Sequence, residues 1–422
     1  MKRRMLAILL VVFMIVTSLV GCSGNNNEPK KEDAAEPTQA EGTKETDKTN
    51  DDADVDNSSD TDLTSEKIYV GLSCAITGDV PLEGDMVSKT VKMVVDEVNA
   101  AGGINGAELA LVIEDDSNVA NTAINVMSKF VSDKKIVLSI GPHRSASVLA
   151  VEAIAKEGGL PMITGGSSKT FYELGNEYLF RIRGCDTLVA SNAAKFCVEN
   201  VGKKIGLIYN NDDYGNGAKQ VIEEYIAGTD AELVAEEAHT TGDKDMTGQL
   251  LACKEAGADV IIGWTHDDEA AVITRQYKEL GLDETIAFVG CSSWANTAFY
   301  KLLNKGLSDG IYATVDFTVT NPDPTAIEFT AKFKEKYNEE PENMAGCYYD
   351  AALLAVDALK RAADSGEVTR ESVREALANT TEPISGNQGQ LYISENGMDF
   401  IHQVVIIKNE NDVPVFQFAV TE

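Results

Sequence analysis

The sequence has 422 residues, of which 43% are hydrophobic and 25% are charged, as is typical of a globular chain with two or three domains. Its 68 acidic and 36 basic residues give a net charge of -32. This balance excludes a nucleic-acid-binding protein, because such proteins concentrate positive charge against phosphates.

The N-terminus carries a targeting pattern. Lys2, Arg3 and Arg4 precede an apolar run over 5–20, which is shorter than the ~20 residues of most membrane-spanning helices. The pattern predicts a signal peptide over 1–21, with a membrane-spanning helix as the alternative. The run ends in "LVGC", which resembles the bacterial lipoprotein signal and implies that Cys22 is lipidated and anchors the chain without spanning the membrane.

Residues 22–65 form a predicted tether. From Ser23 to Ser65 the chain has 13 acidic residues, no aromatic residue, and Val55 and Leu63 as its larger aliphatics. Such a segment cannot bury enough apolar surface to fold. Beyond it, the six cysteines besides Cys22 are widely spaced in apolar surroundings, which favours free thiols over disulfides.

From residue 66 onward, β-branched runs alternate with helical patterns, which predicts parallel sheets covered by helices. The first series starts at "KIYVGLS" and ends at "LPMIT". The second starts at "KIGLIYN" and ends at "IAFVG". The predicted helices cover 84–101, 120–131 and 146–156 in the first series, and 217–227, 246–256, 269–280 and 296–304 in the second.

Each series has the length of one α/β domain, so the pattern predicts two similar α/β lobes in tandem. The last part of the chain contains two long helices over 325–337 and 346–363, and a short one near 372–378. "LYIS" and "QVVIIKN" then read as strands that add antiparallel edges.

The loops after the strands are the candidate ligand site, because open parallel sheets bind ligands outside the carboxyl ends of their strands. These loops are "SCAITGDVPLEGD", "GPHRSAS", "TGGSSKT", "YNNDDYGNG", "GWTHDDE" and "GCSSWAN". Lys169 follows a serine where a phosphate loop requires glycine, and no G-x-S-x-G or zinc or calcium motif occurs. We therefore expect no catalytic residue, metal or cofactor.

Hydrogen bonding remains as the role of the loop serines, namely Ser145, Ser147, Ser167 and Ser168. They either cap helices or present hydroxyl groups, beside helix N–H groups, to a small carboxylate. Tyr214 either packs its loop or contacts the ligand. Arg144 can pair with an anion, and Glu83, Asp267 or Asp268 with an ammonium, although each acid can equally be a solvated charge at a helix start.

Several segments in order resemble the branched-chain amino-acid type of solute-binding proteins, which feed ABC transporters. They are "VDEVNAAGGINGAELALVIEDD", "TGDVPLEGD", "IGPHRSASVLAVEAIAKEGGLPMITGGSS", "LIYNNDDYGNG" and "YYDAALLAVDAL". The resemblance implies a type I periplasmic-binding-protein fold, in which two Rossmann-like lobes with parallel sheets are joined by a three-strand hinge, with crossings near Cys185, Phe317 and Ser385. One lobe would comprise 66–185 and 318–384, and the other 186–317 and 385–422.

By the same resemblance, the ligand carboxylate is held by Ser145, Gly166 and Ser168, and Tyr214 contacts the ligand. Three positions depart from the family pattern. Ser292 stands where amino-acid binders place an acid for the α-ammonium, Thr265 and His266 replace an expected tyrosine, and Glu83 replaces an aromatic residue. Asp267 or Glu83 can hold the ammonium from another direction, or the ligand is an amide, a short peptide or an amine-free carboxylate.

The expected function is that of a lipid-anchored, monomeric, extracytoplasmic binding protein that delivers a small polar solute to an ABC permease and its ATPases. A sensory or regulatory lipoprotein on the same scaffold is the alternative. An amidase-like hydrolase is the weakest hypothesis.

Overall fold

The computed structural model describes residues 67–421. The predictions for the signal peptide, Cys22 and the acidic tether lie outside these residues. Among residues 67–421, no helix combines the length and the apolar composition needed to cross a bilayer. The six cysteines in this range are buried and unpaired, as their surroundings predicted.

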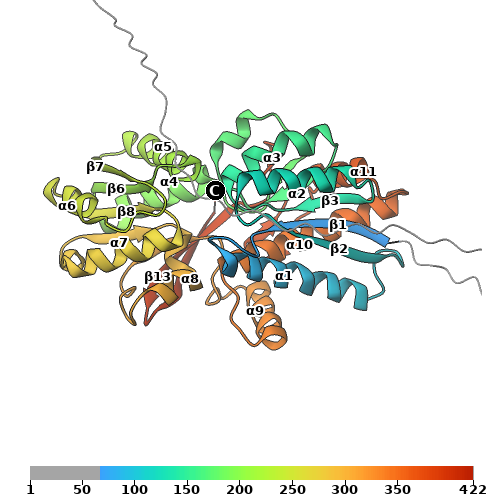
Figure 1. The fold of residues 1–422 in the computed structure, drawn as a ribbon. Helices are drawn as coiled ribbons and strands as arrows, with labels where there is room; N and C mark the ends of the chain where they lie inside the picture. The colour runs from blue at the N-terminus through green and yellow to red at the C-terminus, as the bar shows by residue number, and fades with distance from the viewer. Residues whose placement is uncertain (1–66, 422) are drawn as a thin grey trace, which may run out of the picture. The chain divides into compact units, whose positions relative to one another are not determined.

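The first lobe is built on a parallel five-stranded sheet, with α1 and α10 on one face and α2 and α3 on the other (Figure 1). Strand β3 is buried along its whole length, as a strand covered on both faces must be. In spatial order the strands are β2 (Glu108–Asp115), β1 (Lys67–Cys74), β3 (Ile136–Ile140), β4 (Met162–Thr164) and β5 (Leu179–Arg181). The helices are α1 (Pro81–Ala100), α2 (Ala120–Ser132), α3 (Ser145–Glu157), η1 (Lys169–Glu173), α9 (Pro324–Tyr337), α10 (Asn343–Ser365) and α11 (Arg370–Ala378).

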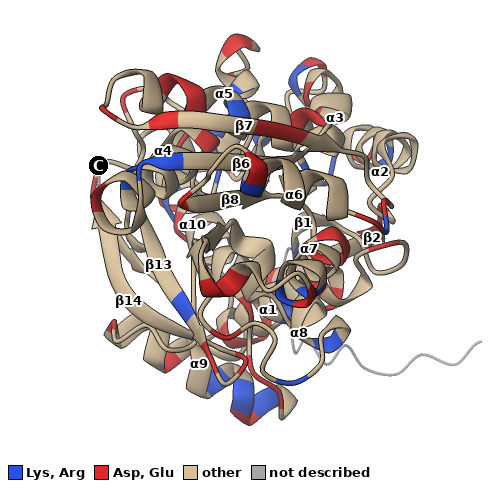
Figure 2. Cartoon of the chain, turned by 90° about the vertical axis from the view of Figure 1, so that its left-hand side faces the viewer, with Lys and Arg blue, Asp and Glu red and all other residues tan. Residues whose placement is uncertain are grey.

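The second lobe is built on a seven-stranded sheet whose last two strands are antiparallel, as predicted for "QVVIIKN". Its edge strand β7 carries Glu232, Glu236 and Glu237, which discourage pairing with another chain (Figure 2). The strands in order are β14 (Val413–Thr421), β13 (Gln403–Glu410), β10 (Tyr312–Val315), β9 (Ala287–Gly290), β8 (Val260–Trp264), β6 (Lys204–Asn210) and β7 (Glu232–His239). The helices are α4 (Asp186–Phe196), η2 (Cys197–Val201), α5 (Asp213–Ala227), α6 (Thr247–Glu255), α7 (Asp267–Glu279), η3 (Leu282–Glu284), η4 (Ser292–Ala295) and α8 (Thr297–Leu302).

The structure differs from the sequence-based expectation in four places. Helix α4 was not predicted, and neither was strand β14. Helix α5 starts four residues before the predicted Gly217, because the Asp212 carboxylate caps it by accepting a hydrogen bond from the Gly215 N–H at 2.8 Å. "LYIS" is not a strand beyond Leu391, where the short hairpin of β11 (Ile384–Gly386) and β12 (Gly389–Leu391) ends.

Residues between the hairpin and β13 return to the first sheet. The Arg181 N–H donates to the Met398 carbonyl at 2.9 Å, and the Phe400 N–H donates to the Arg181 carbonyl at 3.1 Å. Strand β13, three residues later, belongs to the second sheet. We therefore propose that the third crossing lies after Phe400 and not near Ser385.

Both parallel sheets share the doubly wound strand order 2-1-3-4-5, which places a topological switch point between β1 and β3 and another between β6 and β8. The loops that leave these four strands carry Glu83, Arg144, Tyr214 and His266. The strand order therefore brings the predicted loops together at one edge of each sheet, where this architecture binds ligands.

Helix α1 approaches the loop after β1 so closely that Gly84 has no room for a side chain. A Cβ atom on Gly84 would lie 1.9 Å from the Ala75 carbonyl oxygen. We expect Gly84→Ala to lower the free energy of unfolding by at least 1 to 3 kcal/mol, measured by urea denaturation, because the backbone must shift. Gly248→Ala is the control, since Gly248 is exposed on α6 and a Cβ atom there would meet nothing within 4 Å. This alanine should be neutral or slightly stabilising. Equal effects of the two changes would contradict this account.

Candidate functional site

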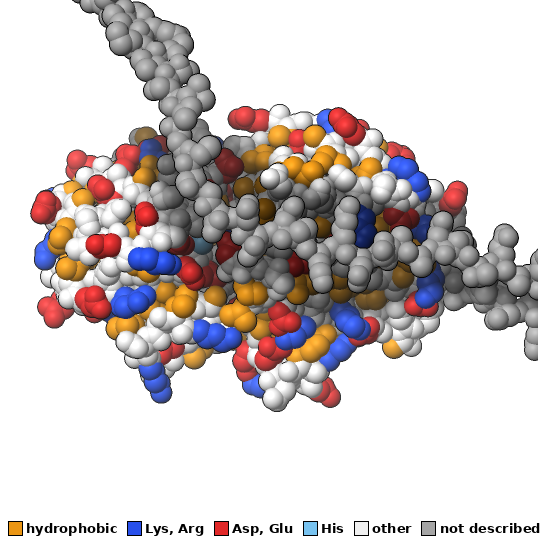
Figure 3. Space-filling model, in the orientation of Figure 1, with side chains coloured by type: hydrophobic (Ala, Val, Ile, Leu, Met, Phe, Trp, Pro, Cys, Tyr) orange, Lys and Arg blue, Asp and Glu red, His pale blue; other side chains and the backbone are white. Residues whose placement is uncertain are grey.

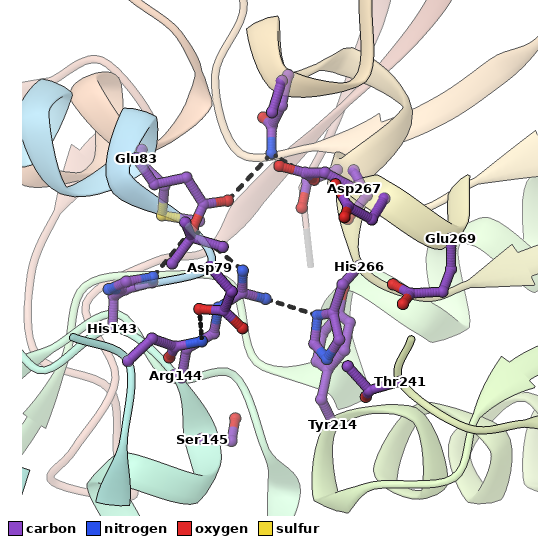
Figure 4. A pocket seen from close by; sticks show the side chains of 18 of the residues that line it. Asp79, Glu83, His143, Arg144, Ser145, Tyr214, Thr241, His266, Asp267 and Glu269 are labelled. Atoms are coloured by element: carbon purple, nitrogen blue, oxygen red, sulfur yellow. Dashed lines mark hydrogen bonds and ion pairs between the residues drawn. The ribbon is translucent and has the colours of Figure 1, made fainter. Parts of the chain in front are cut away.

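A cavity of about 560 Å³ lies between the carboxyl ends of the two sheets. Seven predicted ligand residues line it, and Figure 4 shows most of them converging from α1, α3, α5 and α7. They are Glu83, Arg144, Ser145, Tyr214, His266, Asp267 and Ser292. Gly166 and Ser168 do not line the cavity, and Ser168 is fully buried.

The serine loops do less capping than the sequence suggested. The N-cap of α3 is Arg144, with no side-chain cap, so Ser145 and Ser147 lie in the first helical turn and face the cavity. Ser145 Oγ accepts a hydrogen bond from the Ser168 N–H at 3.2 Å. Ser168 does act as a cap, because its hydroxyl accepts from the Thr170 N–H. Ser168 thus supports the wall, and Ser145 and Ser147 form its surface.

Glu83 is a buried anion at the start of α1. Its carboxylate contacts His143 Nε2 at 2.9 Å, Arg144 Nη2 at 3.3 Å and Asn296 Nδ2 at 3.4 Å. Burial alone would raise the pKa of Glu83, but the Arg144 guanidinium and the His143 hydrogen bond hold it well below its usual range. Glu83 therefore stays ionised, with its charge compensated from its own lobe.

A chain of polar contacts crosses from Arg144 to the second lobe. Arg144 Nη1 lies 2.6 Å from His266 Nδ1, and His266 Nε2 lies 2.7 Å from Asp212 Oδ2. A guanidinium only donates, so Nδ1 must accept and Nε2 carries the proton that is donated to Asp212. His266 also stacks on Tyr214, with ring centroids 5.5 Å apart. Arg144 and His266 thus link the lobes at the mouth of the cavity.

Arg183, on the crossing between the lobes, places a positive charge beside Ser292. Its Nη2 donates to Ser292 Oγ at 2.6 Å and its Nε donates to Asp316 at 2.8 Å. Burial lowers the pKa of Arg183, but Asp316 more than compensates and raises it, so the guanidinium is permanently charged. A cation therefore stands beside the position where the resemblance expected an acid.

Asp267 begins α7 on the opposite wall. Asn296 Nδ2 donates to Asp267 Oδ1 at 3.1 Å, and Oδ2 has no hydrogen-bond partner among the described residues. Burial, followed by the negative charge of Glu83, raises the pKa of Asp267 well above its usual range. Asp267 therefore holds its proton more tightly than an exposed carboxyl does when the cavity contains no cation.

A buried arginine positions the serine loop from behind. Arg181 Nη1 donates to the Ser167 and Ser168 carbonyls at 3.1 and 2.9 Å, and its Nε donates to Asp399 Oδ1 at 2.6 Å. Tyr172 donates its hydroxyl to the same carboxylate at 2.6 Å. Arg181 therefore fixes the backbone from which Ser167 faces the cavity.

Sequence reasoning did not assign site roles to His143, Asn296, Arg183 or Asp212. His143, Asn296 and Asp212 lie in loops that the sequence marked as candidates, so their position in the chain was the signal that could have identified them. Arg183 had no such signal, because it lies in the segment between β5 and α4, outside those loops. Among residues 67–421, no group of three or more His, Cys, Asp or Glu side chains is arranged to hold a metal ion.

Comparisons with known proteins agree with this geometry. The family model described as a periplasmic binding protein matches residues 67–412. The leucine-, isoleucine-, valine-, threonine- and alanine-binding protein of Pseudomonas aeruginosa is 29% identical over 331 residues, which cover 78% of this chain and 86% of that protein.

Solved structures share the fold. The branched-chain amino acid transporter substrate binding protein LivJ of Streptococcus pneumoniae, in complex with isoleucine, has a TM-score of 0.76 and 25% identity, covering 85% of this chain and 99% of that chain. A solute binding protein of Rhodopseudomonas palustris, in complex with 3,4-dihydroxybenzoic acid, has a TM-score of 0.74 and 19% identity, covering 84% and 96%. At that identity the second likeness shows the fold alone.

Proposed function

The chain belongs to the periplasmic binding protein family, and from this premise we propose that it captures a small polar solute between its lobes and delivers it to a membrane permease. It is a substrate-binding protein of the branched-chain amino-acid ABC transporter type and not an enzyme, as the sequence predicted. The hydrolase hypothesis is therefore wrong. Membership of this family also implies an extracytoplasmic location.

The proposed ligand is an amino acid or a related amide or carboxylate. The observation that carries this proposal is the first turn of α3, whose hydroxyl groups of Ser145 and Ser147 face the cavity beside the N–H groups of the helix start. That combination of a positive helix end and hydroxyl donors suits a carboxylate. Arg144 and Arg183 add positive charge on the same side.

We further propose that lipid on Cys22 holds the protein at the membrane and that it acts as a monomer. On the part of the face in Figure 3 that is not covered by grey atoms, acidic and basic side chains are interspersed. The visible surface therefore lacks the concentrated positive charge that a nucleic acid requires.

We expect at least one amino acid to raise the melting temperature of the purified protein. A ligand at a hundred times its dissociation constant adds about 2.7 kcal/mol to the free energy of unfolding.

Ser147→Ala should weaken binding roughly tenfold, since one hydrogen bond to a charged group contributes about 1.5 kcal/mol. The melt without ligand should stay nearly unchanged, because Ser147 caps nothing. A lowered unliganded melt with unchanged affinity would show that Ser147 only supports the fold.

A further inference from the structure

We propose that Asp267 and Asn296 form the subsite for a protonated amine on the ligand. This inference rests on the proposed function and specifies the ligand class. The two side chains come from α7 and from the residue before α8, and both line the cavity. Asp267 is 5% exposed and Asn296 is 2% exposed, so neither is satisfied by bulk solvent.

The two side chains present unused acceptors. Asp267 Oδ2 and Asn296 Oδ1 are both buried without a hydrogen-bond partner among the described residues. The orientation of the Asn296 amide is fixed, because its Nδ2 donates to Asp267 Oδ1 at 3.1 Å and to Glu83 Oε1 at 3.4 Å. Buried acceptors without donors are destabilising, so this pair is built to receive a donor that the chain itself does not supply.

An ammonium suits the position better than a neutral donor or a metal ion. Glu83 and Asp267 face each other from the two lobes (Figure 4), and Glu83 has its charge compensated by Arg144 and His143. Asp267 forms no ion pair with a cation among the described residues, and a bound ammonium would supply one. Hard metal ions take six or more oxygen ligands, and the oxygens of Glu83 are already engaged.

The same geometry excludes the Ser292 position for the amine. An ammonium against Ser292 Oγ would meet the Arg183 guanidinium, whose Nη2 lies 2.6 Å from that oxygen. Like charges at such range repel strongly in a partly desolvated site. The carboxylate end of the ligand therefore belongs on the Arg183 and α3 side, and the amine end on the α7 side.

Binding of an ammonium here should favour loss of a proton from Asp267, because burial and the charge of Glu83 raise the pKa of this carboxyl and a bound cation lowers it again. Glu83 of α1, Arg144 at the start of α3 and Glu342 before α10 are the charged groups that act on Asp267. Glu83 keeps its charge throughout, so the proton comes from Asp267. At pH values below the pKa of Asp267, the affinity for the ligand should increase by up to tenfold for each unit by which the pH is raised.

The test uses the purified protein in calorimetry with the twenty amino acids and their deaminated carboxylic acids. Every binder is expected to carry an amine, and heats in buffers of different ionisation enthalpy should show that binding releases protons, with at most one proton for each ligand bound. Asp267→Asn should weaken binding at least 100-fold and remove the proton release. Its unliganded melt should stay nearly unchanged, since the asparagine oxygen can still accept the hydrogen bond from Asn296. Asp230→Asn, in the exposed turn before β7, is the control and should bind as the wild type does.

Two outcomes separate this inference from the function on which it rests. If deaminated acids bind as tightly as amino acids, or Asp267→Asn binds normally, the amine subsite is wrong and solute capture stands. If no member of the panel binds, both are overturned for this class of solute.

Discussion

Arg181→Met is expected to lower the free energy of unfolding by about 3 to 5 kcal/mol, as measured by denaturant titration. Arg181 is fully buried, and it neutralises Asp399, which is itself buried and accepts the Tyr172 hydroxyl. Without the guanidinium, the Asp399 carboxylate stays in a site of low polarity without a cation. Leaving one partner of a buried pair alone is far more destabilising than removing both.

The double variant Arg181→Met with Asp399→Asn tests that reason. It should recover much of the lost stability, because the uncompensated charge is gone. Arg374→Met is the surface control: Arg374 pairs with the exposed Glu371, and such pairs contribute at most about 1 kcal/mol. If Arg181→Met is no worse than Arg374→Met, the ion pair is not important for stability.

The same substitution should also weaken ligand binding. Arg181 holds the Ser167 and Ser168 carbonyls, so the loop behind the cavity loses two hydrogen bonds when the guanidinium is removed. The double variant restores the charge balance but not these donors. We therefore expect it to be nearly as stable as the wild type and still weaker in ligand affinity.

The sequence correctly predicted those features of the structure that depend on a local pattern of residues. Continuous apolar runs such as "VIIGW" identified the buried parallel strands, and the loops after them contained Glu83, Tyr214 and His266. These predictions succeed because the carboxyl ends of parallel strands must lie at one edge of a sheet. The predicted family and the two-lobed α/β fold are confirmed by the family match and by the structural likeness to LivJ.

The sequence was less informative where packing decided the outcome. Helix α4 is rich in small residues that are buried on most sides, so it lacks the amphipathic stripe by which helices are recognised. Gly166 does not line the cavity, and a Cβ on it would meet the Phe171 ring at 2.8 Å, so contact between its backbone and the ligand stays a prediction. The meeting of Arg183 with Ser292 joins residues 109 positions apart, which no local pattern encodes.

Asp186→Asn is expected to stabilise the protein by roughly 3 kcal/mol at pH 8 and by almost nothing at pH 4. Asp186 is fully buried at the start of α4, and neither carboxylate oxygen has a hydrogen-bond partner among the described residues. Burial raises the pKa of Asp186 to about 6 from 3.8, and each unit corresponds to about 1.36 kcal/mol. The folded chain therefore binds the proton more tightly than the unfolded chain, and wild-type stability falls as the pH rises through the window between those values.

Asparagine cannot ionise, so the variant should lack this loss, and the two stability curves should separate between pH 4 and pH 6 and run parallel above. The measurement is urea denaturation at several pH values, with Asp364→Asn on the exposed end of α10 as the matched control. A variant that is less stable than the wild type at pH 8 would mean that the Asp186 carboxylate is ionised and compensated. In that case the nearby Arg181 and Arg183, which favour the charged form, outweigh its burial.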